Sequence, residues 1–292
     1  MNNIKTYLIL FGGVFALSTS AIWVRVAAAP SSVTAFYRLA ITAAAMLPFF
    51  LLSKSCRAEV KALRRGQWGR TMAAGAFLAL HYLLWFESLN YTSIASSTVI
   101  VCLQPLFSIV LERVLLKSRL RPAALVGCGI ALIGSVIIGF GDLQISGLSL
   151  LGDVLAFVAA GVISGYYFLG QTIRKEVSAL TYSVLAYITS AAVLLIYTLV
   201  RGEALTGYPS QTWLAFVGIA LIATVGGQFV FNLLLKQLPA SAVTMSILGE
   251  PIGTCILAYL FLHESISLQQ LIGIVTIIGG LSVYFLVPSH KK

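Results

Sequence analysis

Charged residues are scarce in this sequence, and acidic residues are the scarcest of them. Only 10% of the 292 residues are charged, and just 9 residues are Asp or Glu. A soluble globular chain carries about 25% charged residues, so this composition argues against an ordinary soluble domain. Apolar residues make up 59% of the chain and the mean hydropathy is +0.97, which excludes a disordered chain. We therefore expect a protein that works within a lipid bilayer.

Motifs for metal, cofactor and catalytic sites are missing as well. The four cysteines show no CxxC or Cys/His spacing that would suit zinc, and we interpret them as free thiols. His263 and Glu264 begin a run that lacks the second histidine of an HExxH protease site, and no glycine-rich phosphate loop follows a strand. We therefore expect no metal, no cofactor and no enzymatic activity.

Apolar runs broken at proline, glycine and charge clusters predict ten membrane-spanning helices. A helix needs about 20 residues to cross a hydrocarbon layer ~30 Å thick, so ten helices leave no room for a large soluble domain. Two of the breaks are marked by Arg121-Pro122 and by Lys236-Gln237-Leu238-Pro239. The predicted spans are 6–28, 33–52, 70–88, 94–116, 122–140, 149–171, 180–200, 211–235, 240–262 and 268–287.

Lysine and arginine are distributed very unevenly among the predicted loops. If the N-terminus is inside, the inner segments hold 15 of the 19 basic residues, and the outer loops hold Arg201. An excess of Lys and Arg marks cytoplasmic loops, so both termini should be cytoplasmic and the protein should lie in the cytoplasmic (inner) membrane. The net charge of +10 is then a topology signal, and we expect no nucleic-acid partner.

Two segments of the chain resemble each other. Leu89–Pro105 and Leu235–Pro251 align without gaps at a spacing of 146 residues, and the match continues to Gly127/Gly273 and Gly134/Gly280. We interpret this as an internal repeat, with halves at residues 1–145 and 146–292. Each half would hold five helices, and an odd number inserts the second copy from the opposite side of the membrane. The expected fold is therefore all-α, with ten transmembrane helices in two inverted repeats, as in many secondary transporters.

Several motifs, in their order and spacing, resemble the drug/metabolite transporter superfamily and its ten-helix EamA-type branch. They are Thr34–Leu39, the Leu89 to Ser108 stretch, Glu250-Pro251 and Leu260–Ser265, followed by Gly273–Gly280. The resemblance implies transport of amino acids, other metabolites or drugs. One position departs from the family: Ser118 stands where an acidic residue often follows the fourth helix, as Glu264 does in the second half.

Glu250 and its repeat counterpart Gln104 should lie at mid-membrane depth. Each precedes a proline, Pro251 or Pro105, and proline frees a backbone carbonyl and can kink a helix. We hypothesise that this region forms a binding and coupling site, in which Glu250 takes up a proton or pairs with a substrate ammonium. The alternative is a structural glutamate that holds the kink.

An aromatic wall is predicted on the third span, where His81, Tyr82 and Trp85 are close in sequence. His81 and Trp85 are four residues apart and share one helix face, so they could stack on a solute. Gln228 and Asn232 on the eighth span are the candidate opposing polar pair. Core packing of the aromatic residues and an interhelical hydrogen bond of the amides are the alternatives.

Arg38 on the second span is a candidate ligand for a substrate carboxylate, because charges within a membrane usually face the bundle interior. The alternative is an ion pair with Glu87, which should lie at a similar depth and could act as a gate. Trp23 and Tyr166 could complete the aromatic lining. Glu112 and the adjacent Arg113, near the inner end of the fourth span, are expected to be structural partners or snorkelling groups.

These observations predict a secondary carrier that exports amino acids or related small metabolites by alternating access. Protons are the candidate coupling ion, and the protein could be a monomer or a homodimer. An uptake carrier or exchanger of the same fold is the first alternative. A membrane channel or sensor is the alternative of another class.

Overall fold

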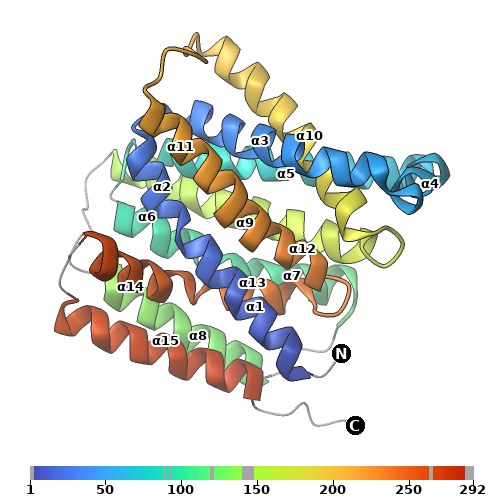
Figure 1. The fold of residues 1–292 in the computed structure, drawn as a ribbon. Helices are drawn as coiled ribbons and strands as arrows, with labels where there is room; N and C mark the ends of the chain where they lie inside the picture. Colours follow the sequence, from blue (N-terminus) through green and yellow to red (C-terminus); the bar gives the residue numbers. More distant parts are fainter. Residues whose placement is uncertain are drawn as a thin grey trace.

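The computed structural model describes residues 3–88, 90–92, 94–118, 122–139, 148–262 and 266–286. Every regular element within these ranges is a helix, which confirms the predicted all-α class. The first-half helices are α1 (Asn3–Ser18), α2 (Ser20–Ala27), α3 (Ser31–Leu52), α4 (Lys54–Ala62), α5 (Arg65–Ser88), α6 (Ile94–Val101), α7 (Gln104–Leu115) and α8 (Pro122–Gly139) (Figure 1).

The second half of the chain contains one helix of unusual geometry. Between α11 and α12 the chain forms a π-helix, η2, whose i→i+5 geometry is rare and often found at functional sites. The elements are α9 (Ser149–Ile173), α10 (Ala179–Val200), α11 (Ser210–Gly218), η2 (Ile219–Gln228), α12 (Phe229–Leu234), α13 (Ala240–Ile247), α14 (Glu250–Leu262) and α15 (Leu268–Leu286).

Within the described ranges, seven stretches are long and apolar enough to cross a membrane. The remaining predicted spans, 70–88, 94–116 and 122–140, coincide with α5, with α6 and α7, and with α8. These helices are less uniform, because α5 and α7 carry charges and the apolar part of α8 is short. The seven stretches are Ile4–Ala27, Ser31–Leu52, Ser149–Ile173, Ala179–Val200, Ser210–Leu234, Ala240–Leu257 and Leu268–Leu286.

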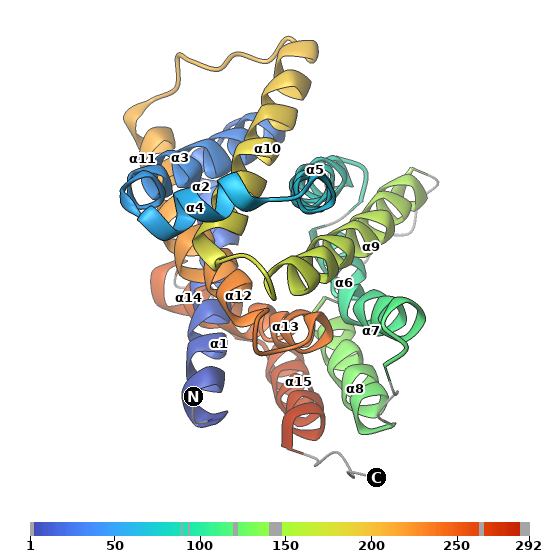
Figure 2. The ribbon, with the colours of Figure 1, turned by 90° about the vertical axis from the view of Figure 1, so that its right-hand side faces the viewer.

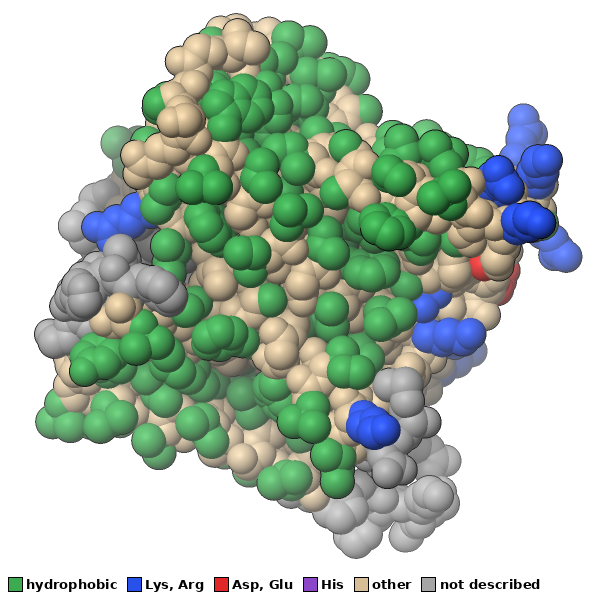
Figure 3. All heavy atoms as spheres, in the orientation of Figure 1, with side chains coloured by type: hydrophobic (Ala, Val, Ile, Leu, Met, Phe, Trp, Pro, Cys, Tyr) green, Lys and Arg blue, Asp and Glu red, His purple; other side chains and the backbone are tan. Residues whose placement is uncertain are grey.

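Basic side chains collect at one end of the helices, which we call the basic face. It carries α4, and Lys and Arg side chains gather over this end in the space-filling view (Figure 3). The start of α1 and the end of α15 lie at the same end (Figure 1). The turn after α10, which contains Arg201 and Glu203, lies at the opposite end, which we call the far face.

The fourth and ninth predicted spans break at equivalent positions. Helix α6 and helix α13 have the same length, and Gln104 and Glu250 begin α7 and α14. Pro105 and Pro251 occupy the second position of these new helices, where the missing N–H has no intrahelical partner to lose. The repeated proline therefore explains why the chain interrupts both helices at the same point of the repeat.

Helices α8 and α15 cross through glycines that meet in a reciprocal pattern. A Cβ on Gly127 would lie 2.6 Å from the carbonyl oxygen of Gly280, and a Cβ on Gly134 would lie 2.8 Å from that of Gly273. Gly127 thus meets Gly280, which is the repeat counterpart of Gly134, and Gly134 meets Gly273, which is the counterpart of Gly127. Two antiparallel helices related by a two-fold axis produce this exchange of contacts.

Large apolar side chains remain on the outside of the bundle. Leu52 and Val200, for example, are each 81% exposed, and apolar side chains cover much of the surface in Figure 3. Surfaces of this extent are not stable in water, but they suit contact with lipid tails. The core instead buries many tyrosines, together with Arg38.

Candidate functional site

Arg38 is a cation buried between helices of the bundle. It projects from α3, is 1% exposed, and donates from Nε to Thr224 Oγ1 at 2.9 Å and from one terminal nitrogen to Ser20 Oγ at 3.0 Å. Its guanidinium carbon lies 4.7 Å from the centre of the Tyr82 ring, a cation–π contact. These neutral partners orient the guanidinium and leave its charge uncompensated by them.

Side chains of α3 make polar contacts with the π-helix η2. Thr42 Oγ1 lies 3.1 Å from the carbonyl oxygen of Ala220, and Thr224 Oγ1 donates to Ile219 at 3.0 Å. Arg38 bonds the same threonine hydroxyl. Helix α3 thereby makes polar contacts with Ala220 and Thr224 of η2, the element whose last residue is Gln228.

The three aromatic residues of α5 form one stack. The ring centroids of His81 and Trp85 are 5.9 Å apart with an interplanar angle of 17°, and Tyr82 lies beside His81. His81 Nδ1 is 3.1 Å from the carbonyl oxygen of Ala159. Because a carbonyl only accepts, Nδ1 carries the hydrogen. The indole N–H of Trp85 is buried and has no partner among the described residues.

Gln228 and Asn232 enter a buried network with tyrosines of α9 and α10. Asn232 Nδ2 lies 2.6 Å from the hydroxyl of Tyr166 and 3.2 Å from that of Tyr187, and Tyr167 donates to Gln228 Oε1 at 3.1 Å. Within the described part of the chain, Gln228 Nε2 and Asn232 Oδ1 stay without partners. Buried polar atoms are normally hydrogen-bonded, so these two atoms are free to bind a polar ligand group.

Glu250 begins α14 and is partly exposed. Its carboxyl group lies within electrostatic range of Arg38, Tyr82 and Tyr167, and no direct bond from it to these residues is among the hydrogen bonds of the described chain. The N-terminal end of a helix also favours a negative charge at this position. Glu250 therefore brings a carboxyl group within electrostatic range of the cluster around Arg38.

Matching serines hold the two broken helices. Ser18 Oγ donates to the carbonyl oxygen of Glu250 at 3.1 Å, and Ser164 Oγ donates to that of Gln104 at 2.7 Å. The serines are themselves 146 residues apart. The same local contact is thus made twice, once in each half.

Most of the predicted site residues come together around Arg38. Trp23 lies apart from this cluster, against Gly218 of α11, where a Cβ would be 2.7 Å from the indole ring. The side chain of Gln104 is buried and uncharged, whereas its counterpart Glu250 lies within electrostatic range of Arg38. The residues brought together are Arg38, His81, Tyr82, Trp85, Tyr166, Gln228, Asn232 and Glu250.

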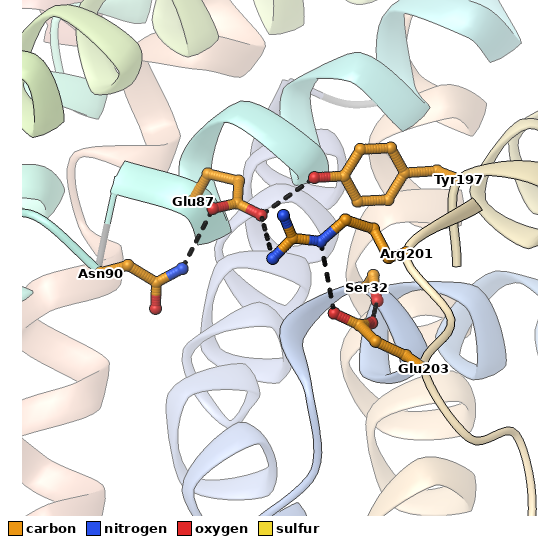
Figure 4. Close-up of polar contacts among 6 residues, drawn as sticks. All are labelled: Ser32, Glu87, Asn90, Tyr197, Arg201 and Glu203. Carbon is orange, nitrogen blue, oxygen red and sulfur yellow. Dashed lines mark hydrogen bonds and ion pairs between the residues drawn. The ribbon is translucent and has the colours of Figure 1, made fainter. Parts of the chain in front are cut away.

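The predicted pair of Arg38 and Glu87 is wrong. Glu87 instead accepts a hydrogen bond from Tyr197 at 2.9 Å and lies 4.0 Å from Arg201, at the far face (Figure 4). Arg201 also lies 3.8 Å from Glu203, which bonds Ser32 of α3. The loop residue Arg201 reaches Glu87 from the end of α10, whereas Arg38 points deeper, toward η2.

Glu112 is buried and bonds the start of helix α13, whereas Arg113 bonds the carbonyl oxygen of Ser118. Its two carboxylate oxygens accept from the backbone N–H of Ser241 at 2.9 Å and from Ser241 Oγ at 2.7 Å. Helix α13 has Pro239 at its N-cap and so lacks a side-chain cap of its own. A carboxylate from α7 therefore caps this helix and ties the two halves together near the basic face.

Sequence reasoning missed the side chains that position the site, among them Ser18, Thr42, Ser164 and Thr224. Each is a small hydroxyl residue in an apolar helix, and such residues usually bond their own backbone. The repeat spacing of Ser18 and Ser164 was the signal that could have found two of them.

A groove of about 380 Å³ lies between α1, α14 and α15. The two halves differ at this place. Gly253 in α14 has Phe107 of α7 as its repeat counterpart. The Phe107 ring fills the equivalent space in the first half, where its centroid lies 5.0 Å from that of Phe157 and its edge lies against Gly161. Half-exposed side chains such as Phe15 and Ile278 line the groove. It lies on the apolar outer surface, so it differs from the binding site predicted at mid-membrane depth near Glu250 and Gln104.

Broken, unevenly charged helices around a buried charged cluster define a multi-pass membrane protein with a polar interior. The chain matches the model of the EamA-like transporter family twice, over residues 4–140 and 150–286. The chain therefore belongs to the EamA-like transporter family, within the drug/metabolite transporter superfamily.

Relatives with curated names are transporters too. A Bacillus subtilis (strain 168) protein named "Uncharacterized transporter YwfM" is 28% identical over 99% of this chain and 96% of its own length. The "Riboflavin transporter ImpX" of Fusobacterium nucleatum is 27% identical over 62% of this chain and 63% of its own. A solved structure titled "Crystal structure of protein" shares the fold, with a TM-score of 0.80 over 97% of this chain and 98% of that chain, at 18% identity.

Proposed function

We propose that residues 1–145 and 146–292 are five-helix repeats inserted in opposite orientations, giving ten spans with both termini in the cytoplasm. The reciprocal glycine contacts of α8 and α15 support a two-fold relation between the halves, as do the equivalent bonds of Ser18 and Ser164. The basic face, which carries both ends of the described chain, is then cytoplasmic. The membrane would be the inner membrane.

Such halves can exchange conformations, which supports a secondary carrier that works by alternating access. Both ends of the interface between the halves are tied in this structure, by Glu87 and Arg201 at the far face and by Glu112 and Ser241 near the basic face. Opening either end would break one set of contacts and keep the other. The solute would then reach the buried cluster from one side at a time.

The proposed solutes are amino acids or related small zwitterions, moved outward. The observation that carries this proposal is a buried guanidinium, Arg38, that lies over the Tyr82 ring, together with the carboxyl group of Glu250, whose charge acts electrostatically on both residues. Arg38 would bind the solute carboxylate, and Glu250 would pair with its ammonium group or with a proton. The free Gln228 and Asn232 atoms would bind remaining polar groups.

A second candidate is the uptake of planar aromatic metabolites. The stacked pair of His81 and Trp85 favours it, and one relative is named a riboflavin transporter. The two candidates use the same cluster and differ in the solute and in the direction of net flux.

The test is a screen of metabolites for thermal stabilisation of the purified protein, followed by counterflow of the labelled hit in liposomes. A solute that binds the folded state raises the melting temperature by mass action. We expect Trp85→Ala to weaken binding about threefold to tenfold, the range for loss of an aromatic contact. Unchanged affinity in that variant would assign Trp85 to packing, and non-saturable flux without counterflow would favour a channel.

A further inference from the structure

Helix α4 carries a stripe of cations on one face. Lys54, Arg57 and Lys61 are three and four residues apart, so they project from the same side of the helix, and all three are exposed. Arg64 and Arg65 follow directly and are also exposed. We call Lys54, Arg57 and Lys61 the basic stripe.

The opposite face of α4 is fixed to the protein. Cys56 is 5% exposed, and its sulfur lies 3.7 Å from Ser178 Oγ, while Glu59 accepts from the Ser178 N–H at 3.0 Å. Burial lowers the pKa of the Arg174 guanidinium, whereas the nearby Glu59 carboxylate raises it. Glu59 of α4 thus bonds the rest of the protein, whereas the basic stripe projects from the opposite side of the helix.

Apolar side chains lie immediately beside the stripe. Phe49 and Leu52, in the last turn of α3, are 69% and 81% exposed, and Lys54 begins α4 just after Ser53. Phe49 and Leu52 belong to a candidate membrane span, which would place them in contact with hydrocarbon. Helix α4 lies at one end of the bundle (Figure 1), where Lys and Arg side chains gather (Figure 3). A stripe that directly follows a candidate span would therefore lie at the level of lipid headgroups.

We propose that the basic stripe is a docking site for the headgroups of anionic phospholipids in the leaflet at the basic face. The charge of the stripe complements a phosphate-bearing headgroup, and Phe49 and Leu52 place acyl chains directly below it. Clusters of Lys and Arg next to a membrane span bind anionic lipid in this way. A soluble phosphate would use the cations alone, whereas the combination of cations and exposed apolar residues selects a lipid.

A bound lipid would also hold the start of α10. Ser178 is the N-cap of α10, and Glu59 bonds its N–H from α4. Lipid contact at the stripe therefore anchors a joint between the first and second halves of the chain. This role concerns the membrane partner of the protein and does not depend on which solute is carried.

The experiment titrates the purified full chain in neutral detergent with phosphatidylglycerol and follows its melting temperature. Phosphatidylcholine tests for a general lipid effect, and glycerol phosphate tests for the headgroup without its chains. The stripe variant is Lys54→Gln/Arg57→Gln/Lys61→Gln. The matched control, Lys117→Gln/Lys175→Gln/Lys236→Gln, removes three other exposed cations and leaves the stripe intact.

We expect phosphatidylglycerol to stabilise the protein and its control variant, and phosphatidylcholine to do so much less. The stripe variant should bind phosphatidylglycerol on the order of 100-fold more weakly, because each cation near an anionic surface contributes a factor of about five. Equal loss in the control, unchanged binding in the stripe variant, or equal stabilisation by glycerol phosphate would each overturn the proposal. If the triple variant is unstable, Arg57→Gln carries the test with about a fivefold loss.

Discussion

Glu250 is the side chain that would couple transport to protons. It lies at the helix break, where its carboxyl group interacts with Arg38, and it is the charged member of a pair whose counterpart, Gln104, has no titratable group. A glutamine at position 250 keeps the shape and removes the exchangeable proton. We therefore expect Glu250→Gln to abolish flux driven by a pH gradient while leaving solute exchange in place.

Liposomes with and without an imposed pH gradient separate these two outcomes. Glu112→Gln is the control, because Glu112 is a second glutamate within the helices, caps α13 through Ser241 and lies outside the proposed coupling site. It should lower stability by about 1–3 kcal/mol, the cost of a weakened buried hydrogen bond, without removing the response to pH. A pH response that persists in Glu250→Gln would refute the coupling role.

The crossing of α8 and α15 depends on glycine at particular positions. A Cβ on Gly280 would lie 2.4 Å from the backbone nitrogen of Ala131, whereas a Cβ on the adjacent Gly279 would meet nothing within 4 Å. Gly280→Ala should therefore destabilise the protein by about 1–3 kcal/mol through overpacking. Gly279→Ala should change stability by no more than about 0.5 kcal/mol, as is usual away from packed sites.

Thermal unfolding of the two variants in the same detergent provides the measurement. Both substitutions replace glycine by alanine in one helix, so helix propensity affects them alike. Equal melting temperatures would mean that the helices can separate at this crossing without cost, and the two-fold packing argument would lose its support.

Much of the helical order could be predicted from sequence, because apolar runs and repeated prolines act locally. Pro105 and Pro251 marked the positions where α7 and α14 begin. The π-helix could not be predicted, since Arg38 and Thr42 stabilise it from another helix. The pairing of Glu87 failed for a similar reason: the reach of Arg201 depends on how the turn after α10 folds back. The partners that side chains bond within a cluster depend on tertiary contacts, and these cannot be read from the spacing of residues along the sequence.

The two halves of the chain are joined at both faces, and alternating access requires these joints to open in turn. At the far face, Glu203 from the turn after α10 bonds Ser32 at the start of α3. At the basic face, Glu176 beyond α9 bonds Gln67 in α5. Both contacts connect residues of different halves, so a covalent bond at either place should stop the cycle.

Cysteine pairs placed at these contacts test this requirement. We expect oxidation of Ser32→Cys/Glu203→Cys to reduce counterflow to the level of protein-free liposomes, and reduction of the disulfide to restore it. The control is Ser88→Cys/Ser97→Cys, in which the two native hydroxyls are 2.6 Å apart and both belong to the first half. This bond should leave counterflow largely intact, because it constrains one half without tying it to the other. If the far-face disulfide forms fully and counterflow continues, the halves do not separate at that face, and a different opening must admit the solute.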